Sequence, residues 1–350
     1  MTSKSLNNQF FSRVIGLLES AKNKVVRSVN QTMVFTYFEI GKMIIEEEQE
    51  GNKKAEYGKS LLKGLSKTLT SKFGKGFSET NLKQMRQFYL AYSKSQTLSD
   101  ASQQLPEEVG KQIRQTTSDN FSLSWSHYLK LMRIDNLNER NFYEIEAAKN
   151  NWSVRELQRQ YDSALYTRLT LSRDKHQVRE LSEKGLVIEN PEDAIKDPYV
   201  LEFLGLPDHS SYSENELEAE LINKLEHFLL ELGSGFTFVA RQKRISFEDK
   251  HFRIDLVFYN RVLKCFVLID LKIGELKHQD IGQMQMYVNY YDREIKLEDE
   301  NKTIGLILSQ NKSEAVVKYT LPETNKQIFA SKYKTILPSK SELKSLMKGN

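Results

Sequence analysis

The sequence of 350 residues contains a single cysteine, Cys265, within a hydrophobic run. One cysteine can form neither an intrachain disulfide nor a thiolate zinc site, so we expect a reducing, cytoplasmic setting. Long hydrophobic runs are also missing: the longest, 266–269 and 304–308, have only the length of a strand. No apolar stretch follows the first charge at the N-terminus. We therefore expect neither a membrane span nor a signal peptide.

Several motifs that define other enzyme classes are absent. The chain has no G-x-x-x-x-G-K-[ST] phosphate loop, no G-x-S-x-G nucleophile elbow and no H-E-x-x-H zinc motif. A strong excess of one charge is missing as well, because 51 basic and 47 acidic residues leave a net charge of +4. This small surplus is compatible with nucleic-acid binding but does not indicate it. The 39% of hydrophobic and 28% of charged residues are typical of a globular protein. The length of 350 residues suits two domains.

The first half of the sequence has the pattern of an all-helical domain. Apolar residues recur at helical spacing over 9–49, and a second apolar stripe spans 57–73. Glycines follow this stripe, and Ser78 is a suitable N-cap for a further helix over 79–92. The helix, the glycine turn and the next helix predict an all-α domain of helix-turn-helix type.

Basic residues are concentrated in this region. Residues 53–94 carry ten Lys or Arg side chains against two Glu. On the second helix of the pair, Lys83, Gln84 and Arg86 are the residues that a DNA-reading helix would use. The same pattern fits a solvated helical face, and such helical hairpins are common in proteins that never contact DNA. The domain is therefore expected to bind either DNA or a protein partner.

Composition divides the chain into three parts. Residues 1–182 form the helical domain, in which 93–120 is rich in Ser, Gln and Thr and is expected to be a loop with at most one short helix. Residues 183–213 hold three of the six prolines and are expected to be a linker. Residues 214–345 are expected to form an α/β (α+β) domain with a mixed sheet. Its expected αβββαβ order is a helix over 214–232, strands over 236–247, 251–259 and 263–273, a helix over 279–291 and a strand over 303–309.

The second and third of these strands each deliver an acid. Asp255 lies inside an otherwise β-branched and aromatic strand, and Asp270 ends a nearly continuous apolar run. Because strand side chains alternate between faces, Asp270 and Lys272 point the same way. Charges at the end of a buried strand are costly unless they bind something or each other. A buried Asp–Lys pair is the plain explanation, and a divalent-metal site is the functional one.

A metal site would draw on the same residues. The carboxylates of Asp255 and Asp270 and the backbone carbonyl of Leu271 could hold Mg²⁺, for which Mn²⁺ would substitute. The ion would polarise a scissile phosphate and acidify a bound water. Lys272 would stabilise the negative charge that develops on the phosphate. Whether one or two ions bind stays open.

The pattern of Asp255, fourteen residues and then Asp270-Leu271-Lys272 resembles the PD-(D/E)XK (restriction-endonuclease-like) nuclease superfamily. Longer segments resemble the YhcG-like proteins, which join such a nuclease domain to a helical N-terminal domain. These segments lie within 35–335 and include FLLELGSGFTFVARQKRI, DLVFYNRVLKCFVLIDLKIG, GQMQMYVNYYD, YFEIGKMIIEEEQ and NNWSVRELQRQ. The family more often has Glu at the position of Asp270, and the shorter side chain would shift the metal. The resemblance implies a metal-dependent nuclease with Asp255, Asp270 and Lys272 as catalytic residues.

The helix before the strands offers a further acid. Positions i+3, i+4, i+7 and i+11 from Glu218 are all Leu or Ile, so its carboxylate lies on the apolar stripe that faces the sheet. From Glu220 the same periodicity reaches polar residues, as on a solvated face, and Glu216 lies with Glu220. The resemblance selects the same residue. We expect Glu218 to bind the metal or its water.

Two further groups complete the expected site. Related nucleases carry a Gln-x-x-x-Tyr pair on the helix after the catalytic strand, which Gln283 and Tyr287 match. Gln283 would hydrogen-bond the attacking water or a phosphate, and Tyr287 would border the nucleic acid. A plain helical surface explains both residues equally simply. On the first strand, Arg241, Lys243 and Arg244 would meet the DNA backbone.

The expected function is metal-dependent hydrolysis of phosphodiester bonds in nucleic acid, with DNA as the expected substrate, in repair, recombination, restriction or mobile-element processes. The alternative is a non-catalytic DNA- or protein-binding accessory factor on a nuclease fold, although an intact Asp255, Asp270 and Lys272 argue against it. The sequence leaves open the substrate structure and endo- or exonuclease action. The oligomeric state is also open, although cutting both strands of a duplex would favour a homodimer.

Overall fold

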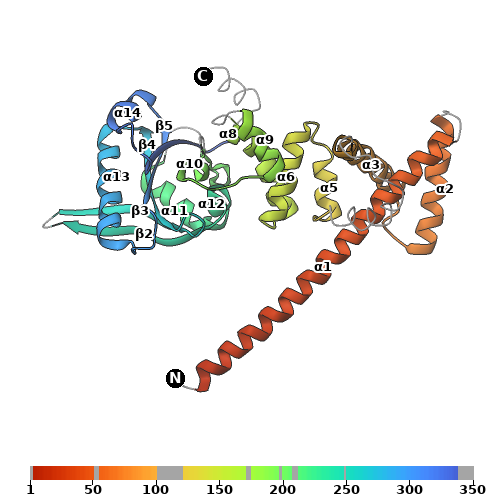
Figure 1. Ribbon diagram of the computed structural model, residues 1–350, viewed down its shortest axis with the longest axis horizontal. Coiled ribbons are helices and arrows are strands. Elements are labelled where there is room, and N and C mark those ends of the chain that lie inside the picture. The colour runs from red at the N-terminus through yellow and green to blue at the C-terminus, as the bar shows by residue number, and fades with distance from the viewer. Residues whose placement is uncertain are drawn as a thin grey trace. The chain divides into compact units, whose positions relative to one another are not determined.

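The computed structural model describes residues 3–50, 55–100, 121–170, 175–196, 199–206, 212–247 and 250–337. The chain divides into two compact units, Met1–Gln158 and Arg159–Asn350, with the division inside helix α7 (Val154–Asp162). Figure 1 shows the all-helical first unit and the sheet of the second. None of the described helices combines the length and the hydrophobicity that a membrane-spanning segment needs.

The first unit is helical, as predicted. Its helices are α1 (Ser3–Glu50), α2 (Ala55–Phe73), α3 (Glu79–Asp100), α5 (Trp125–Leu131) and α6 (Leu137–Lys149). α3 packs on α1 so closely that a Cβ at Gly41 would clash with the carbonyl oxygen of Met85. The rings of Phe38, Phe88 and Tyr128 are buried here. α3 continues through Asp100, beyond its expected end at 92, and residues 101–120 of the expected loop lie outside the described residues.

The turn between α2 and α3 has the chemistry that the sequence indicated. Gly74 and Gly76 adopt φ values of 81° and 124°, which a side chain would disfavour. The hydroxyl of Ser78 accepts a hydrogen bond from the Asn81 amide at 3.2 Å and so caps α3. The helical hairpin therefore forms.

The second unit contains a six-stranded mixed sheet with the order β1-β6-β5-β4-β3-β2. Its strands are β1 (Tyr199–Val200), β2 (Phe236–Phe247), β3 (Lys250–Asn260), β4 (Cys265–Glu275), β5 (Ile304–Asn311) and β6 (Ile328–Lys334). β3 runs antiparallel to both of its neighbours, β2 and β4, whereas β4, β5, β6 and β1 are parallel to one another. Together with the helices described in the next paragraph, the strands confirm the expected αβββαβ order. β1 and β6 were not expected.

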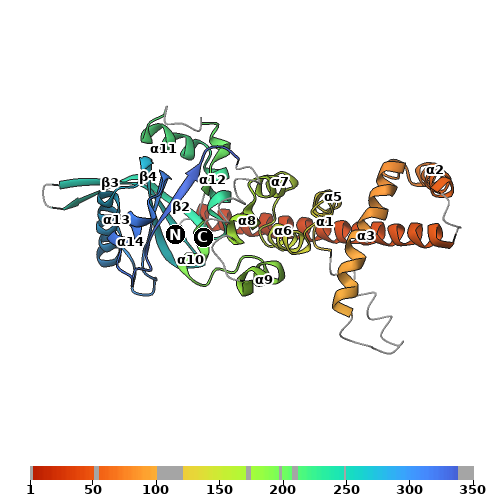
Figure 2. The ribbon, with the colours of Figure 1, turned by 90° about the horizontal axis from the view of Figure 1, so that it is seen from above.

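Helices cover both faces of the sheet. α11 (Glu214–Asn223) and α12 (Leu225–Leu232) enclose one apolar core, which includes Phe228, Leu256 and Ile269. α13 (His278–Tyr290) and α14 (Glu314–Thr320) lie on the opposite face, as Figure 2 shows, over a core that includes Val257 and Met284. The sandwich fixes strands β3 and β4 between two helical layers.

Two expected elements differ from the structure. The single helix expected over 214–232 is two helices, because Lys224 leaves helical geometry with φ −116° and ψ 35°. The linker expected over 183–213 includes α10 (Pro191–Ala194), β1 and the short 3-10 helix η2 (Glu202–Leu204). Tyr199 of β1 pairs with Tyr333 of β6, so this proline-bearing segment belongs to the sheet of the second unit. Two helices, α8 (Leu165–Thr170) and α9 (Lys175–Lys184), precede it.

Candidate active site

The two strand acids lie where β3 and β4 separate. The ladder between these strands ends at the pair Leu256–Ile269, and Asp255 and Asp270 are the next residues on either side. Beyond this point β4 remains paired with β5, and β3 with β2. Asp255 Oδ2 accepts a hydrogen bond from the Leu271 backbone amide at 2.8 Å, which ties the two strands across the opening. Two carboxylates thus share one opening in the sheet.

Asp270 and Lys272 form the ion pair expected from their spacing. Lys272 Nζ lies 3.0 Å from Asp270 Oδ2, and Asp270 is only 1% exposed. Burial and then the negative charge of Asp255 raise the pKa of Asp270 to about 7, although Lys272 opposes this. Burial alone would lower the pKa of Lys272, but the charge and hydrogen bond of Asp270, with the charges of Glu214 and Asp255, together raise it. The lysine therefore stays cationic beside the acids.

Glu218 is the buried acid of α11, as its periodicity predicted. It is 4% exposed, whereas Glu216 is exposed and caps the helix through the amide of Ser213. Glu220 is half-buried and pairs with Lys224 at 3.5 Å. Burial, and to a smaller extent the charge of Asp255, raises the pKa of Glu218. The helix acid and the strand acids therefore belong to one electrostatic cluster.

Gln242 is a site residue that the sequence reasoning missed. Its side-chain amide donates hydrogen bonds to Glu218 Oε2 and, at 3.1 Å, to Asp255 Oδ1. Its φ of 47° lies in the left-handed region, which is uncommon for a non-glycine residue inside a strand. The only signal in the sequence was an uncharged polar residue within the basic run 241–244. Gln242 joins the acid of the helix to the acid of β3.

The Gln283 and Tyr287 pair lies on α13 and supports β3. The amide of Gln283 donates to the Tyr287 hydroxyl, which donates to the carbonyl of Arg253 at 2.9 Å. Tyr287 is 0% exposed, and burial, followed by the charges of Asp270 and Asp255, raises its pKa. The expected contact of Tyr287 with nucleic acid is therefore replaced by a contact with the β3 backbone, two residues from Asp255.

The expected basic residues are mostly exposed. Arg241 Nε lies 3.6 Å from Glu218 Oε1, while Lys243 and Arg244 lie exposed on β2. In the first unit, Lys83 is exposed, but Arg86 donates to Glu48 Oε2 at 2.7 Å. Gln84 is half-buried. These side chains remain predicted nucleic-acid contacts, and Arg86 already has a structural partner.

The donor set fits a hard divalent cation that keeps several waters. In the described part of the chain, no three His, Cys, Asp or Glu side chains converge closely enough to form a metal shell by themselves. Mg²⁺ needs only one or two carboxylates beside waters and substrate oxygens. Glu218 Oε1 is buried and accepts no hydrogen bond from the described residues, and its ion-pair partner Arg241 lies 3.6 Å away. The oxygen can therefore still accept a hydrogen bond from a water. The carbonyl of Leu271 stays a predicted ligand.

Two protein-family models match the chain. A model of the YhcG PDDEXK nuclease domain matches residues 192–348, and one of the DUF1016 N-terminal domain matches residues 13–168. The Escherichia coli (strain K12) protein named "Putative nuclease YhcG" is 41% identical over 346 residues, which cover 96% of this chain and 92% of that protein.

Solved structures give a weaker likeness. A repair endonuclease from Pyrococcus abyssi aligns at a TM-score of 0.26 and 16% identity, over 38% of this chain and 50% of that one. A complex of EndoMS with double-stranded DNA aligns at 0.27 and 14% identity, over 39% and 51%. The chain thus matches about half the length of these structures, and TM-scores this low carry no functional information.

Proposed function

The chain belongs to the YhcG family of PDDEXK nuclease-domain proteins, and from this premise we propose that it is a metal-dependent nuclease that hydrolyses phosphodiester bonds of DNA. The observation that carries the proposal is the meeting of Asp255, Asp270 and Lys272 where β3 and β4 separate. Buried acids with raised pKa values beside a retained cation are typical of a catalytic site, and Asp270 and Glu218 are such acids.

Two carboxylates of the cluster would hold the metal. Asp255 and Asp270, with the carbonyl of Leu271, would bind Mg²⁺, and Mn²⁺ would substitute. The bound cation supplies polarisation of the scissile phosphate and a more acidic water. Its charge would also keep Asp270 ionised, because a nearby cation opposes the burial that raises the pKa of this residue. Glu218 would accept a hydrogen bond from water at the site through Oε1, which accepts none from the described residues.

The remaining residues position these groups and stabilise charge. The ammonium of Lys272 would face the phosphate oxygens, where its charge acts chiefly on the negative charge that builds up in the transition state. Gln242 would hold Glu218 and Asp255 at a fixed separation through its two hydrogen bonds. Gln283, through Tyr287, would fix the β3 backbone beside Asp255. Exposed Lys243 and Arg244 would contact the DNA backbone.

The first unit would add a second contact with DNA or with a protein partner. Lys83 is exposed on α3, the second helix of the α2–α3 hairpin, in the basic region 53–94. A reducing, cytoplasmic setting suits the buried free thiol of Cys265.

A cleavage panel tests the proposal. Purified protein is incubated with duplex, single-stranded, flap and branched DNA and with RNA, in Mg²⁺, Mn²⁺ or EDTA. The wild type and the control Glu314→Gln, which changes an exposed acid on α14, should cleave at least one substrate only with metal. Asp270→Asn should fold and cleave none. Folded wild-type protein that binds DNA and cleaves no substrate would instead identify an accessory factor.

A further inference from the structure

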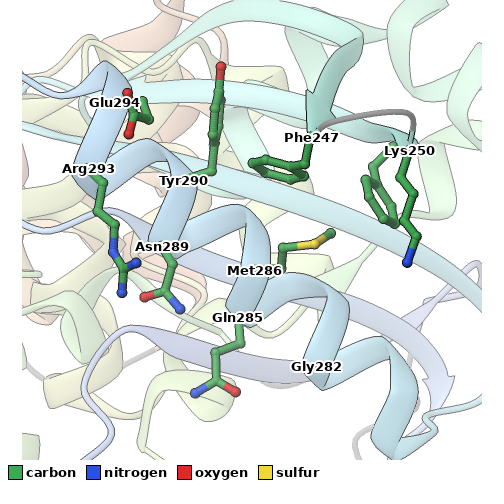
Figure 3. Close-up of a pocket in the computed structure, with 10 residues that line it drawn as sticks. Phe247, Lys250, Gly282, Gln285, Met286, Asn289, Tyr290, Arg293 and Glu294 are labelled. Carbon is green, nitrogen blue, oxygen red and sulfur yellow. The ribbon is translucent and has the colours of Figure 1, made fainter.

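A groove lies between the β2–β3 hairpin and α13, two elements that also carry residues of the candidate site. Its volume is about 680 Å³, and its walls include the rings of Phe247, Phe252 and Tyr290. Figure 3 shows Phe247 and Tyr290 next to each other, with Lys250 beyond Phe247 and Arg293 beyond Tyr290 at the other end. The amides of Gln285 and Asn289 are exposed along its α13 wall.

The three rings form a connected aromatic surface that solvent reaches. Phe247 contacts Tyr290 at 5.3 Å with the rings nearly perpendicular, and Phe252 at 6.0 Å. All three side chains are only half-buried. Half-exposed aromatic rings in a groove bind flat apolar groups well, because the ring faces gain contact area at a small entropic cost. The groove therefore suits a ligand with flat rings.

The charges around the rings suit an anion. Lys250 and Arg293 line the groove and are exposed, against the single carboxylate of Glu294. On the same hairpin, Arg244 and Arg253 pair across the strands on the face opposite Phe247 and Phe252, so they add positive charge to the hairpin outside the groove. Within the groove the cations outnumber the single carboxylate, which suits an anion.

The groove and the candidate site share two elements, β3 and α13. On β3, Phe252 precedes Asp255 by three residues, which is about 10 Å of strand. On α13, Tyr290 follows Tyr287 by about one turn, and the Tyr287 hydroxyl holds the β3 backbone at Arg253. At about 3.4 Å per stacked nucleotide, roughly three nucleotides would separate the cleaved phosphate from the groove.

We propose that this groove binds an unpaired strand of nucleic acid next to the cleaved bond. Bases stack on the three rings and phosphates contact Lys250 and Arg293, as in other single-strand grooves. A duplex hides its base faces, so only an unpaired segment uses the rings. The inference rests on the proposed nuclease function and narrows its substrate to nucleic acid with a single-stranded segment beside the scissile phosphodiester.

Binding without cleavage tests the groove directly. Fluorescence anisotropy in EDTA compares a blunt DNA duplex with the same duplex carrying a single-stranded extension of either polarity. The wild type should prefer an extended duplex, and Tyr290→Ala should reduce that preference at least about fivefold, a typical loss for one stacked base. Lys250→Glu and Arg293→Glu should each lower the salt slope by about 0.7, the value for one phosphate contact on a single strand.

α14 provides matched controls. Lys318 Nζ lies 5.9 Å from the ring of Tyr319, which is 83% exposed, so the pair presents the same chemistry outside the groove. Tyr319→Ala and Lys318→Glu should leave the preference and the slope at wild-type values. If Tyr290→Ala lowers the melting temperature, the exposed Lys250 and Arg293 carry the test, because replacing them disturbs no core.

Three outcomes overturn the proposal. In the first, the wild type binds blunt and extended duplexes with equal affinity. In the second, the groove variants have the same preference and salt slope as their α14 controls. In the third, the groove variants lose as much affinity for blunt duplex as for extended duplex. None of these touches the nuclease proposal if wild-type protein still cleaves DNA with metal. Conversely, a protein that binds the extension through the groove and never cleaves would overturn the nuclease proposal and leave the groove as a binding site.

Discussion

Gln242 connects acids from two different elements. Its amide donates to Glu218 on α11 and to Asp255 on β3, two carboxylates whose charges repel. A φ of 47° costs a residue with a Cβ about 1–2 kcal/mol of conformational free energy. Interactions of the surrounding strands must offset this cost. Backbone strain of this kind is common at functional sites, where it holds side chains in a required position.

Two replacements of Gln242 separate the amide from the backbone. Gln242→Ala and Gln242→Gly should both weaken Mn²⁺ binding about tenfold or more in titration calorimetry, because both remove the amide. Gln242→Gly should be about 1 kcal/mol more stable than Gln242→Ala in urea unfolding, since glycine accepts the positive φ. Gln279→Ala, at an exposed site on α13, is the control. Wild-type Mn²⁺ affinity in both variants would show that Gln242 does not position the acids.

The sequence predicted Glu218 but not Gln242, and the reason is physical. A helix keeps its period, so an acid among leucines had to face the core. A strand with a left-handed residue loses its alternation, and the β2–β3 register has no pair between Arg241–Leu256 and Lys243–Ile254. No rule of alternation could place the amide of Gln242.

Glu231 is a buried acid whose role is structural. It is 0% exposed, lies 2.6 Å from Arg168 Nη1 and 3.3 Å from Arg159 Nη2, and accepts the amide of Val200 at 2.9 Å. Burial would raise its pKa, but the positive charges of Arg168, Lys196 and Arg159 outweigh burial and lower it to about 2. The acid thereby ties α12 to β1 and α8.

This shift predicts an acid-dependent loss of stability. A folded pKa below the unfolded value of 4.5 means that the carboxylate stabilises the fold fully above about pH 4.5 and loses this as the pH falls towards 2. Glu231→Gln should cost about 3–5 kcal/mol at pH 7 in urea unfolding, and the gap to wild type should shrink below pH 4.5. Glu183→Gln, in an exposed pair with Arg179, should change stability by less than about 1 kcal/mol. A gap that stays constant from pH 7 to 3 would contradict the assignment.

At the scale of elements, α13 depends on one glycine of β5. A Cβ at Gly305 would lie 2.5 Å from Met284 Cγ and 2.9 Å from Val288 Cγ2, so only glycine lets this helix approach the sheet. The same helix carries Gln283 and Tyr287, which hold β3 beside Asp255. Helix packing and site geometry are therefore linked.

Gly305→Ala should destabilise the protein by about 1–3 kcal/mol, because the methyl group must displace the helix. Gly282→Ala is the matched control on the open face of α13, where a Cβ meets nothing within 4 Å, and it should raise stability by about 0.5–1 kcal/mol. Adding Met284→Ala to Gly305→Ala should cost less than the two single changes together, since the residues share one space. A neutral Gly305→Ala would show that the contact is loose.

The sequence predicted the central strands to within a few residues, because turns bound each apolar run. It did not predict β1 or the break at Lys224. β1 has only two residues and depends on pairing with β6, a contact across more than 100 positions that no local pattern reveals. Lys224 Nζ donates to the carbonyl of Leu204 at 2.9 Å, a tertiary contact beside the break that separates α11 from α12.

At the scale of the whole molecule, the net charge is small although the first unit is basic. The cations of this unit do not all have the same role. Lys83 is exposed, whereas Arg86 holds Glu48 of α1 at 2.7 Å. If the unit binds DNA, Lys83→Glu should weaken binding and lower the salt slope by about 0.9–1.8, with the melting temperature unchanged. Arg86→Glu should chiefly lower the melting temperature, because two carboxylates would then meet. Anisotropy at several salt concentrations separates the two effects. An unchanged slope for Lys83→Glu would indicate protein contacts instead.

In the proposed hydrolytic enzyme, Lys272 acts on the reaction rather than on the fold. The most direct measurement is the single-turnover cleavage rate of Lys272→Met, which keeps the volume of the stem and deletes the charge. Lys272→Met should bind DNA within a few-fold of wild type and cleave it about 10² or more times slower, the loss expected for one electrostatic group at a transition state. A lowered melting temperature with an unaltered rate per folded molecule would contradict this role and would leave Lys272 as a structural partner of Asp270.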